Sequence, residues 1–582
     1  MRKIIFSIFL FFSFFLGSSV ILAGWTPTNY TVASQNADNP EYTLPALAFN
    51  QSGYTVVAWT SFDTSFLPSR GTIQASISTD FGLTWSPAAY IDQADYHTPA
   101  PPGFGGANMH VRAAINENNQ SLIVWHRYNS SLSRYEVRAC SLTNTPLGPT
   151  TPSVTLLDPN AGVGESGKQA PRPKISMVGN SAIAIWDHEN GGNHDVYYSI
   201  TTDSGANWST AQAIPMDGAL TPNLEPVFAQ LYFGATGLAV VIFQYSPDGT
   251  NNYTCQSVST DSGNTWSNAL ILAGPSSGIW EWTFPALDGD NNGNAVAAWQ
   301  IYTGTIYEIQ SSSYISGSGW TPVQTIDPAA GYDWCEPRIS VNNNNEAIIT
   351  YQEDDSTGNY WPKIAFSSNS GQTWGVPVYI DPLNPENEWN VHPEIIIDDY
   401  GVVLCVWNSN IGGSNWAIKG AVSNDYGSTW SITTLSSLVT SNSAYCPRVK
   451  VYALDSGNKN ALNGFAIWPH VYSGLPPYGA VETNHFQEIT LKATGEQQKI
   501  KDFLQEELQN VISAEAIGNY GTFKLYKDAA LTQLIGTVSN THRVAKFIEN
   551  NLVRGKSFTY YITWTDQFGK GTVGPVVVRI EG

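Results

Sequence analysis

The stretch Ser78-Thr79-Asp80-Phe81-Gly82-Leu83-Thr84-Trp85 belongs to a pattern that returns along the chain. The pattern Ser/Thr-x-Asp-x-Gly-x-Thr-Trp occurs again, with small departures, in residues 201–208, 259–266, 367–374 and 423–430. Repeats at such regular spacing are typical of propellers and other arrays in which each unit buries its faces only against its neighbours. The chain is therefore predicted to be an all-β propeller.

Each residue type in the motif suits a tight turn. Asp accepts backbone N–H bonds, Gly takes a positive φ, Thr favours the strand that follows, and Trp packs between sheets. The motif resembles the Asp-box, or BNR repeat, of the sialidase-like β-propellers, and this resemblance implies that the turns lie away from the catalytic face. We therefore expect a structural role for the motif aspartates Asp80, Asp203, Asp261 and Asp425.

A second repeating phrase predicts the number of blades. Apolar runs that end in an aromatic residue occur at residues 56–59, 122–125, 183–186, 240–243, 296–299, 348–351, 403–407 and 465–468. The last unit lacks a fourth strand, and Gly24-Trp25-Thr26-Pro27 repeats the phrase Gly319-Trp320-Thr321-Pro322. An N-terminal strand that completes the last blade would close the ring and remove its free edge. This interpretation favours eight blades, with seven as the alternative.

Three segments are expected. Residues 1–23 have two basic residues, an apolar run and small residues near a plausible cut, as in a secretory signal peptide. Residues 24–487 form the propeller. Residues 488–582 contain alternating strands, and Gly555 to Ile562, followed by Asp566-Gln567-Phe568-Gly569, resembles the late strands of fibronectin type III-like β-sandwiches.

Composition excludes some partners. A formal net charge of −21 argues against nucleic acid or an anionic membrane, since both require a basic face. No further apolar stretch is long enough to span a membrane after signal cleavage, and we expect a secreted, periplasmic or cell-surface monomer. No metal-ligand spacing or cofactor motif is present. Buried free thiols are expected, with one disulfide as an alternative, for Cys140, Cys255, Cys335, Cys405 and Cys446.

Candidate ligand-binding residues fall on the predicted channel face. The loops between second and third strands contribute Asp187 and Glu189, and the links between blades contribute Trp282, Trp334 and Trp389. Indole faces surrounded by carboxylates suit carbohydrate. The alternative is that the tryptophans pack between blades and the carboxylates belong to solvated turns.

Arginines recur just inside the innermost predicted strands, at Arg112, Arg172, Arg338 and Arg448. Several guanidinium groups aimed at one channel fit a carboxylate ligand by bidentate pairing. The alternative is that each pairs with a nearby acid such as Glu336 or Glu394.

The sialidase resemblance implies an arginine triad for a ligand carboxylate. However, the first inner strand, Leu44-Pro45-Ala46-Leu47, has no arginine, and no Tyr–Glu nucleophile pair stands out. The sequence favours an exported, non-catalytic propeller that binds glycan or protein at its channel face. The alternatives are an exo-acting glycoside hydrolase of sialidase type and a purely structural surface component.

Overall fold

Every regular element that the structure describes is a β-strand, as the all-β prediction required. Within this described part, no helix is long and apolar enough to cross a membrane. The chain divides into two compact units, residues 30–452 with 466–483, and residues 1–29, 453–465 and 484–582. The computed structural model describes residues 19–25, 30–35, 45–50, 52–63, 70–79, 82, 84–93, 110–129, 132, 134–142, 153–163, 171–220, 222–225, 227–278, 281–354, 356, 359–381, 390–399, 401–410, 415–440, 448–453, 462–471, 479–492, 510–515, 521–526, 532, 534–540, 544–549, 557–566 and 569–579.

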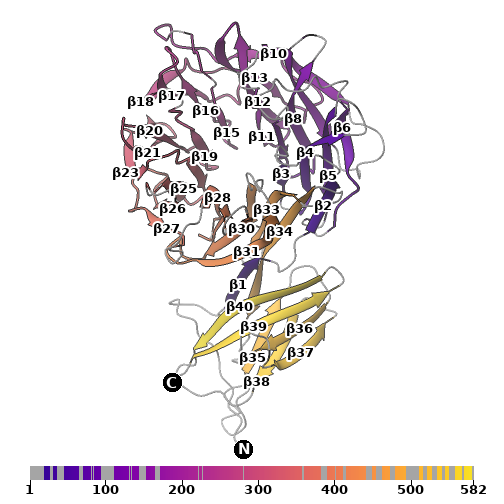
Figure 1. Cartoon of the computed structure of the whole chain (residues 1–582). Helices are drawn as coiled ribbons and strands as arrows, with labels where there is room; N and C mark the ends of the chain where they lie inside the picture. Colours follow the sequence, from indigo (N-terminus) through magenta and orange to yellow (C-terminus); the bar gives the residue numbers. More distant parts are fainter. Residues whose placement is uncertain are drawn as a thin grey trace, which may run out of the picture. The chain divides into compact units, whose positions relative to one another are not determined.

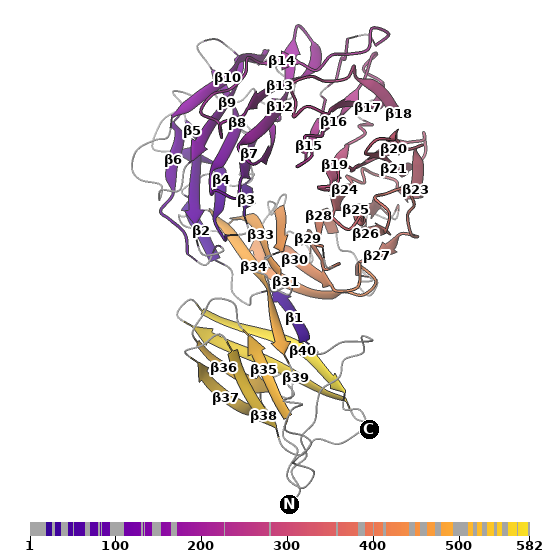
Figure 2. The same cartoon turned by 180° about the vertical axis from the view of Figure 1, so that it is seen from behind.

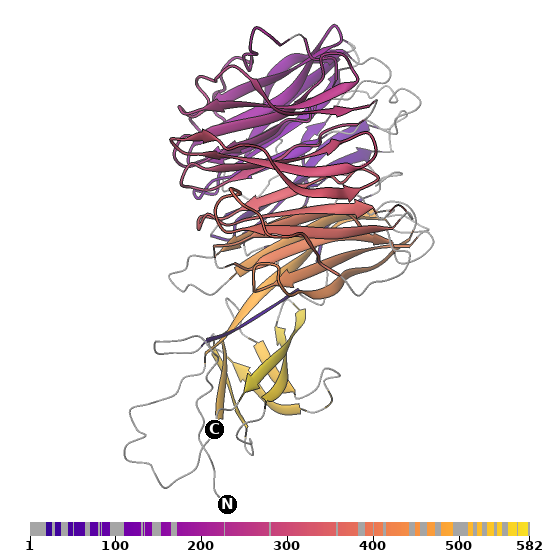
Figure 3. The ribbon, with the colours of Figure 1, turned by 90° about the vertical axis from the view of Figure 1, so that its left-hand side faces the viewer.

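The first unit is a seven-bladed β-propeller, in which seven antiparallel sheets of consecutive strands follow one another around a ring (Figures 1 and 2). Seen from the side, the strands run across the thickness of the ring (Figure 3). Blades 1 to 3 consist of β3 (Ala46–Phe49), β4 (Thr55–Asp63), β5 (Arg70–Ser78) and β6 (Ala89–Gln93); β7 (Val111–Ile115), β8 (Ser121–Asn129), β9 (Arg134–Leu142) and β10 (Val154–Val163); and β11 (Lys174–Val178), β12 (Ser181–Asn190), β13 (Asn193–Thr201) and β14 (Gln212–Ala213).

Blades 4 to 7 repeat the same order, and blade 5 has one additional strand. They consist of β15 (Gln230–Phe233), β16 (Ala239–Tyr245), β17 (Asn251–Ser259) and β18 (Leu270–Ser277); β19 (Ala286–Gly289), β20 (Ala295–Tyr302), β21 (Tyr307–Ile315), β22 (Gly319–Trp320) and β23 (Gln324–Gly331); β24 (Arg338–Val341), β25 (Ala347–Asp354), β26 (Tyr360–Ser367) and β27 (Val378–Tyr379); and β28 (Asn390–Ile397), β29 (Val403–Asn410), β30 (Asn415–Ser423) and β31 (Ser431–Thr440).

The favoured count of eight blades is not borne out, and the alternative count of seven holds. The strands expected in an eighth blade, β32 (Arg448–Ala453), β33 (Leu462–Val471) and β34 (Gly479–Lys492), belong to a seven-stranded sheet instead of a separate four-stranded one. The reason is the length of β34. Its first part pairs with β2 (Tyr30–Gln35), and its later part pairs with β1 (Ser19–Trp25).

The second unit contains a four-stranded antiparallel sheet in the order β37 (Leu534–Asn540), β36 (Gly521–Tyr526), β39 (Ser557–Asp566) and β40 (Gly569–Arg579). Two further strands, β35 (Asn510–Glu515) and β38 (Val544–Glu549), pair with each other, and β35 also pairs with the end of β34. Residues 1–18 of the predicted signal peptide lie outside the described residues, and residues 19–23 begin β1.

The second strand of each blade forms the core because it is covered on both faces. Trp59, Trp125, Trp186, Trp299 and Trp407 end these apolar runs and are fully buried. In four of the five repeated turns, the third residue accepts the bonds predicted for it. In the 259–266 turn, Oδ1 of Asp261 accepts from the Thr265 N–H and the Ser259 hydroxyl, both at 2.8 Å. The other three are at Asp203, Asn369 and Asp425, while Asp80 lies outside the described residues.

The glycines of these turns pack against the preceding blade. Gly263 has φ +83°, and a Cβ placed on it would lie 2.7 Å from Cδ1 of Ile183 in blade 3. Four cysteines, Cys140, Cys255, Cys335 and Cys405, are buried and free, as expected, and Cys446 lies outside the described residues.

Candidate functional site: the central cavity

The innermost strands of all seven blades surround a cavity of about 570 Å³. At the beginning of the innermost strand of each of blades 2 to 7, two residues spaced by two positions line the cavity. The cavity is therefore lined by two successive layers of side chains. The pairs are His110 and Arg112, Arg172 and Lys174, Phe228 and Gln230, Phe284 and Ala286, Glu336 and Arg338, and His392 and Glu394.

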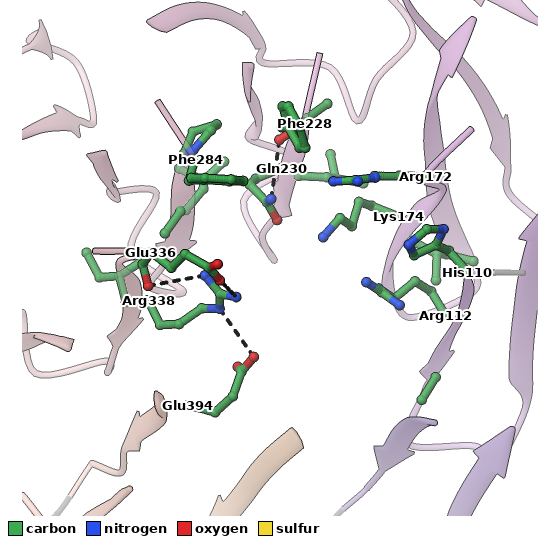
Figure 4. A pocket seen from close by; sticks show the side chains of 18 of the residues that line it. His110, Arg112, Arg172, Lys174, Phe228, Gln230, Phe284, Glu336, Arg338 and Glu394 are labelled. Carbon is green, nitrogen blue, oxygen red and sulfur yellow. Dashed lines mark hydrogen bonds and ion pairs between the residues drawn. The ribbon is translucent and has the colours of Figure 1, made fainter. Parts of the chain in front are cut away.

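One wall of the cavity is cationic. Arg112, Arg172 and Lys174 come from the adjacent blades 2 and 3 and lie on the same side as His110 (Figure 4). Burial lowers the pKa of His110 well below 6.5, and the positive charges of Arg172, His126, Arg112 and Lys174 add to this effect. The imidazole of His110 is therefore neutral at neutral pH.

The opposite wall carries paired charges (Figure 4). Arg338 Nε lies 3.2 Å from Glu394 Oε1, and Arg338 Nη2 lies 3.5 Å from Glu336 Oε2. His392 Nε2 lies 3.7 Å from the other oxygen of Glu336. Arg338 therefore lines the cavity and also pairs with the two acids that the sequence suggested, Glu336 and Glu394.

The third wall is aromatic. Phe228, Trp282 and Phe284 line the cavity, with ring centroids 5.0 Å apart for Phe228 and Trp282 and 5.3 Å apart for Phe228 and Phe284. Arg172 joins this wall to the cationic one, because its Cζ lies 4.4 Å from the centroid of Phe228. Such a contact combines cation–π attraction with close packing.

The structure brings four of the candidate residues to this cavity, namely Arg112, Arg172, Arg338 and Trp282. Trp334 is not among the lining residues but stacks on Trp282, with centroids 5.5 Å apart and an interplanar angle of 28°. The backbone of Arg448 begins β32, while its side chain and the whole of Trp389 lie outside what the structure describes.

The two carboxylates assigned to a loop, Asp187 and Glu189, instead lie buried near the end of β12 and do not line the cavity. The loop assignment was wrong because β12 runs ten residues, beyond the apolar run that ends at Trp186. Oδ1 of Asp187 lies 2.9 Å from His194 Nδ1, and Oδ2 accepts from the Val227 N–H at 3.4 Å. Glu189 Oε1 accepts from the Gly192 N–H at 2.7 Å.

Sequence reasoning missed several lining residues, including His110, Lys174, Phe228, Gln230 and Phe284. A sequence signal exists for His110 and Lys174, because each lies two positions from a cavity arginine, Arg112 or Arg172. The pairs that contain Phe228, Gln230 and Phe284 include no arginine and carry no such signal.

Comparisons with known proteins give only distant likenesses. No protein-family model matches the chain, and no curated protein matches it. A polysaccharide lyase described as an ulvan lyase, solved with a GlcA(1–4)Rha3S fragment, is 10% identical with a TM-score of 0.40 and covers 79% of this chain and 95% of its own. A Hadza microbial sialidase is 14% identical, with a TM-score of 0.31 and coverage of 61% and 73%. A Penicillium chrysogenum α-L-arabinanase is 13% identical, with a TM-score of 0.34 and coverage of 59% and 98%. Likenesses this weak assign no function.

Proposed function

We propose that the central cavity binds an acidic carbohydrate and that the ligand carboxylate lies against Arg112, Arg172 and Lys174. The observation that carries the proposal is the convergence of these three cationic side chains, from two adjacent blades, on one wall of a single cavity. Guanidinium groups pair with a carboxylate through two parallel N–H bonds, which fixes the orientation of the ligand as well as attracting it.

The acidic character of the whole chain makes this group of cations a strong indication of an anionic ligand. The protein carries a formal net charge of −21, which repels anions at long range. Short-range attraction must therefore come from a local group of cations. The two carboxylates on the lining, Glu336 and Glu394, both pair with Arg338 on the opposite wall.

Other features of the lining favour a sugar over a simple organic acid. The half-buried ring of Phe284 offers a face for sugar C–H groups, while Gln230 and the glutamates can bond to hydroxyls. The volume of about 570 Å³ lies within the range of about 300 to 1,000 Å³ found for sites that enclose small ligands.

The alternative function, an exo-acting glycoside hydrolase of sialidase type, has less support. The residue contributed by blade 1 where that family would place an arginine is Ala46. Among the described residues that line the cavity there is no tyrosine to act as a nucleophile. These features favour a binding site.

We place this binding function in an exported protein. The basic and apolar segment of residues 1–23 supports a signal peptide, and the recurring turns support an Asp-box, or BNR, relationship. The β37–β36–β39–β40 sheet supports a fibronectin type III-like module, which would serve as a spacer or docking unit.

The test is calorimetric titration of the purified protein with N-acetylneuraminate, glucuronate and galacturonate, each compared with its carboxyl-reduced form. We expect at least one acidic sugar to bind and its reduced form to bind at least tenfold more weakly. Arg112→Ala should remove this difference. Arg134→Ala is the matched control, since Arg134 is an exposed arginine on the third strand of the same blade.

Equal affinity for the acidic and reduced sugars, or no binding of any acidic sugar, would overturn the proposal. A fluorogenic sialoside tests the alternative in parallel. Turnover that is abolished by Arg338→Ala would replace the binding role with the hydrolytic one.

A further inference from the structure

Four residues that lie just before, or near the start of, the inner strands of blades 4 to 7 have left-handed backbone. The φ angles are +44° for Phe228, +39° for Phe284, +44° for Glu336 and +55° for His392, and all four residues line the cavity. Bulky side chains rarely adopt such angles, and the conformation costs free energy unless the surroundings enforce it. Its recurrence in blades 4 to 7, at the same place relative to the cavity, points to a function for these four residues.

Buried side chains of the neighbouring blades enforce this backbone. Gln300 in blade 5 accepts from the N–H groups of Cys335 and Glu336 at 2.7 and 3.0 Å, and donates to the carbonyl of Trp282 at 2.8 Å. Gln352 accepts from the His392 N–H at 2.9 Å in the same way. Hydrogen bonds from one blade to the next therefore fix the backbone of the cavity-lining residues Glu336 and His392.

The same arrangement fixes the aromatic wall. Gln244 in blade 4 accepts from the N–H of Thr283, directly before Phe284, at 2.9 Å. The ring of Phe284 also packs against Trp282 and Trp334, with centroids 5.7 and 5.5 Å away. Phe228 and Trp282 are almost completely buried, whereas Phe284 keeps part of its surface open. Phe284 is thus the aromatic residue of this wall whose ring stays most accessible to a ligand.

We propose that Phe284 forms a second subsite, which holds an uncharged sugar joined to the acidic one. This inference rests on the proposed function and narrows it, because the ligand becomes a mixed oligosaccharide instead of a single acidic sugar. The cationic wall and the aromatic wall meet where Arg172 lies over Phe228, so the two sugars bind side by side. A second carboxylate at Phe284 would lose hydration against an apolar surface, and Arg338 of the neighbouring blade already pairs with Glu336 and Glu394.

The test measures affinity for glucuronate, for the mixed disaccharide glucuronosyl-N-acetylglucosamine, and for galacturonate beside digalacturonate. For the wild type we expect the mixed disaccharide to bind at least tenfold more tightly than glucuronate. Digalacturonate should gain less than twofold over galacturonate. Phe284→Leu keeps an apolar side chain and removes the flat ring, so it should lower the ratio of the two affinities, mixed disaccharide over glucuronate, from at least tenfold to less than twofold.

Two controls separate the possible failures. Phe366→Leu alters a half-buried phenylalanine of blade 6 that is not among the cavity-lining residues and should keep the gain. Arg112→Ala should weaken binding of glucuronate and of the mixed disaccharide equally. If glucuronate binds but the added sugar gives no gain, or if the gain survives Phe284→Leu or is matched by digalacturonate, the second subsite is refuted. If no acidic sugar binds at all, the proposed function itself fails, and the second subsite fails with it.

Discussion

The indole N–H of Trp186 in blade 3 donates a hydrogen bond of 2.8 Å to Oδ2 of Asp158 in blade 2. The same relationship crosses the seam between blades 1 and 2, where Trp125 donates to Asp92 at 3.0 Å. A tryptophan in one blade's second strand thus donates a hydrogen bond to a carboxylate in the preceding blade's fourth strand. Because these carboxylates are buried, the bond is charge-assisted and poorly screened.

We expect Asp158→Ala to destabilise the propeller by about 2 to 4 kcal/mol, since the substitution leaves both the buried indole N–H of Trp186 and Nδ1 of His188 without their partner. Chemical denaturation followed by tryptophan fluorescence measures the change. A double-mutant cycle with Trp186→Phe isolates the bond itself. Additive effects of the two substitutions would show that the bond does not couple the blades.

Acid should destabilise the folded protein through His110. In the folded state its pKa lies well below 6.5, chiefly because of burial, so the unfolded chain takes up a proton near pH 6.5 that the folded chain does not. Stability should therefore fall as the pH drops through about 6.5, by up to about 1.4 kcal/mol per pH unit, until the folded-state pKa is reached.

The measurement is the free energy of unfolding between pH 7.5 and 5.0 for the wild type and for His110→Gln. The variant should lose less stability over this window. Parallel curves would show that His110 takes up its proton equally in both states.

The turn at residues 423–430 offers an internal comparison. Oδ1 of Asp425 accepts from the Thr429 N–H at 2.8 Å, and Asn369 makes the equivalent bond to the Thr373 N–H at 2.9 Å. We expect Asp425→Ala to cost about 1 to 2 kcal/mol and Asp425→Asn to cost less than about 0.5 kcal/mol. Thermal unfolding of both variants checks this, and equal losses would mean that the charge, and not the accepted bonds, stabilises the turn.

The fold was readable from the sequence because local signals repeat. Each motif turn depends only on its own Asp or Asn, Gly and Trp. The apolar runs that end at residues such as Trp299 indicate strands that are buried on both faces. The favoured count of eight blades was not borne out, because a local sequence pattern does not show where a strand ends, whereas the alternative count of seven holds. The sequence of β34 does not reveal that it continues past Thr483 into a different set of pairings.

The candidate site was readable only in part. Arg112, Arg172 and Arg338 were found because arginine is rare in this chain and these three lie at or just before the predicted inner strands. Phe284 was missed because aromatic residues make up 12% of the chain, so one phenylalanine does not by itself indicate a binding site. Its significance comes from a positive φ and from Gln244 of the neighbouring blade, and neither is visible in the residues around it.

The pairing of Tyr30 with Thr483 also dictates an order of events during folding. The strands of blades 1 to 7 can pair with partners made just before or after them, so each sheet can form as the chain lengthens. Strand β2 is made before all of these blades and meets β34 only after the last of them is complete. Contacts between such distant segments form slowly, because a long loop must first be closed. We therefore expect β2 to join β34 after the seven blades have formed, and an incomplete chain would carry β2 unpaired.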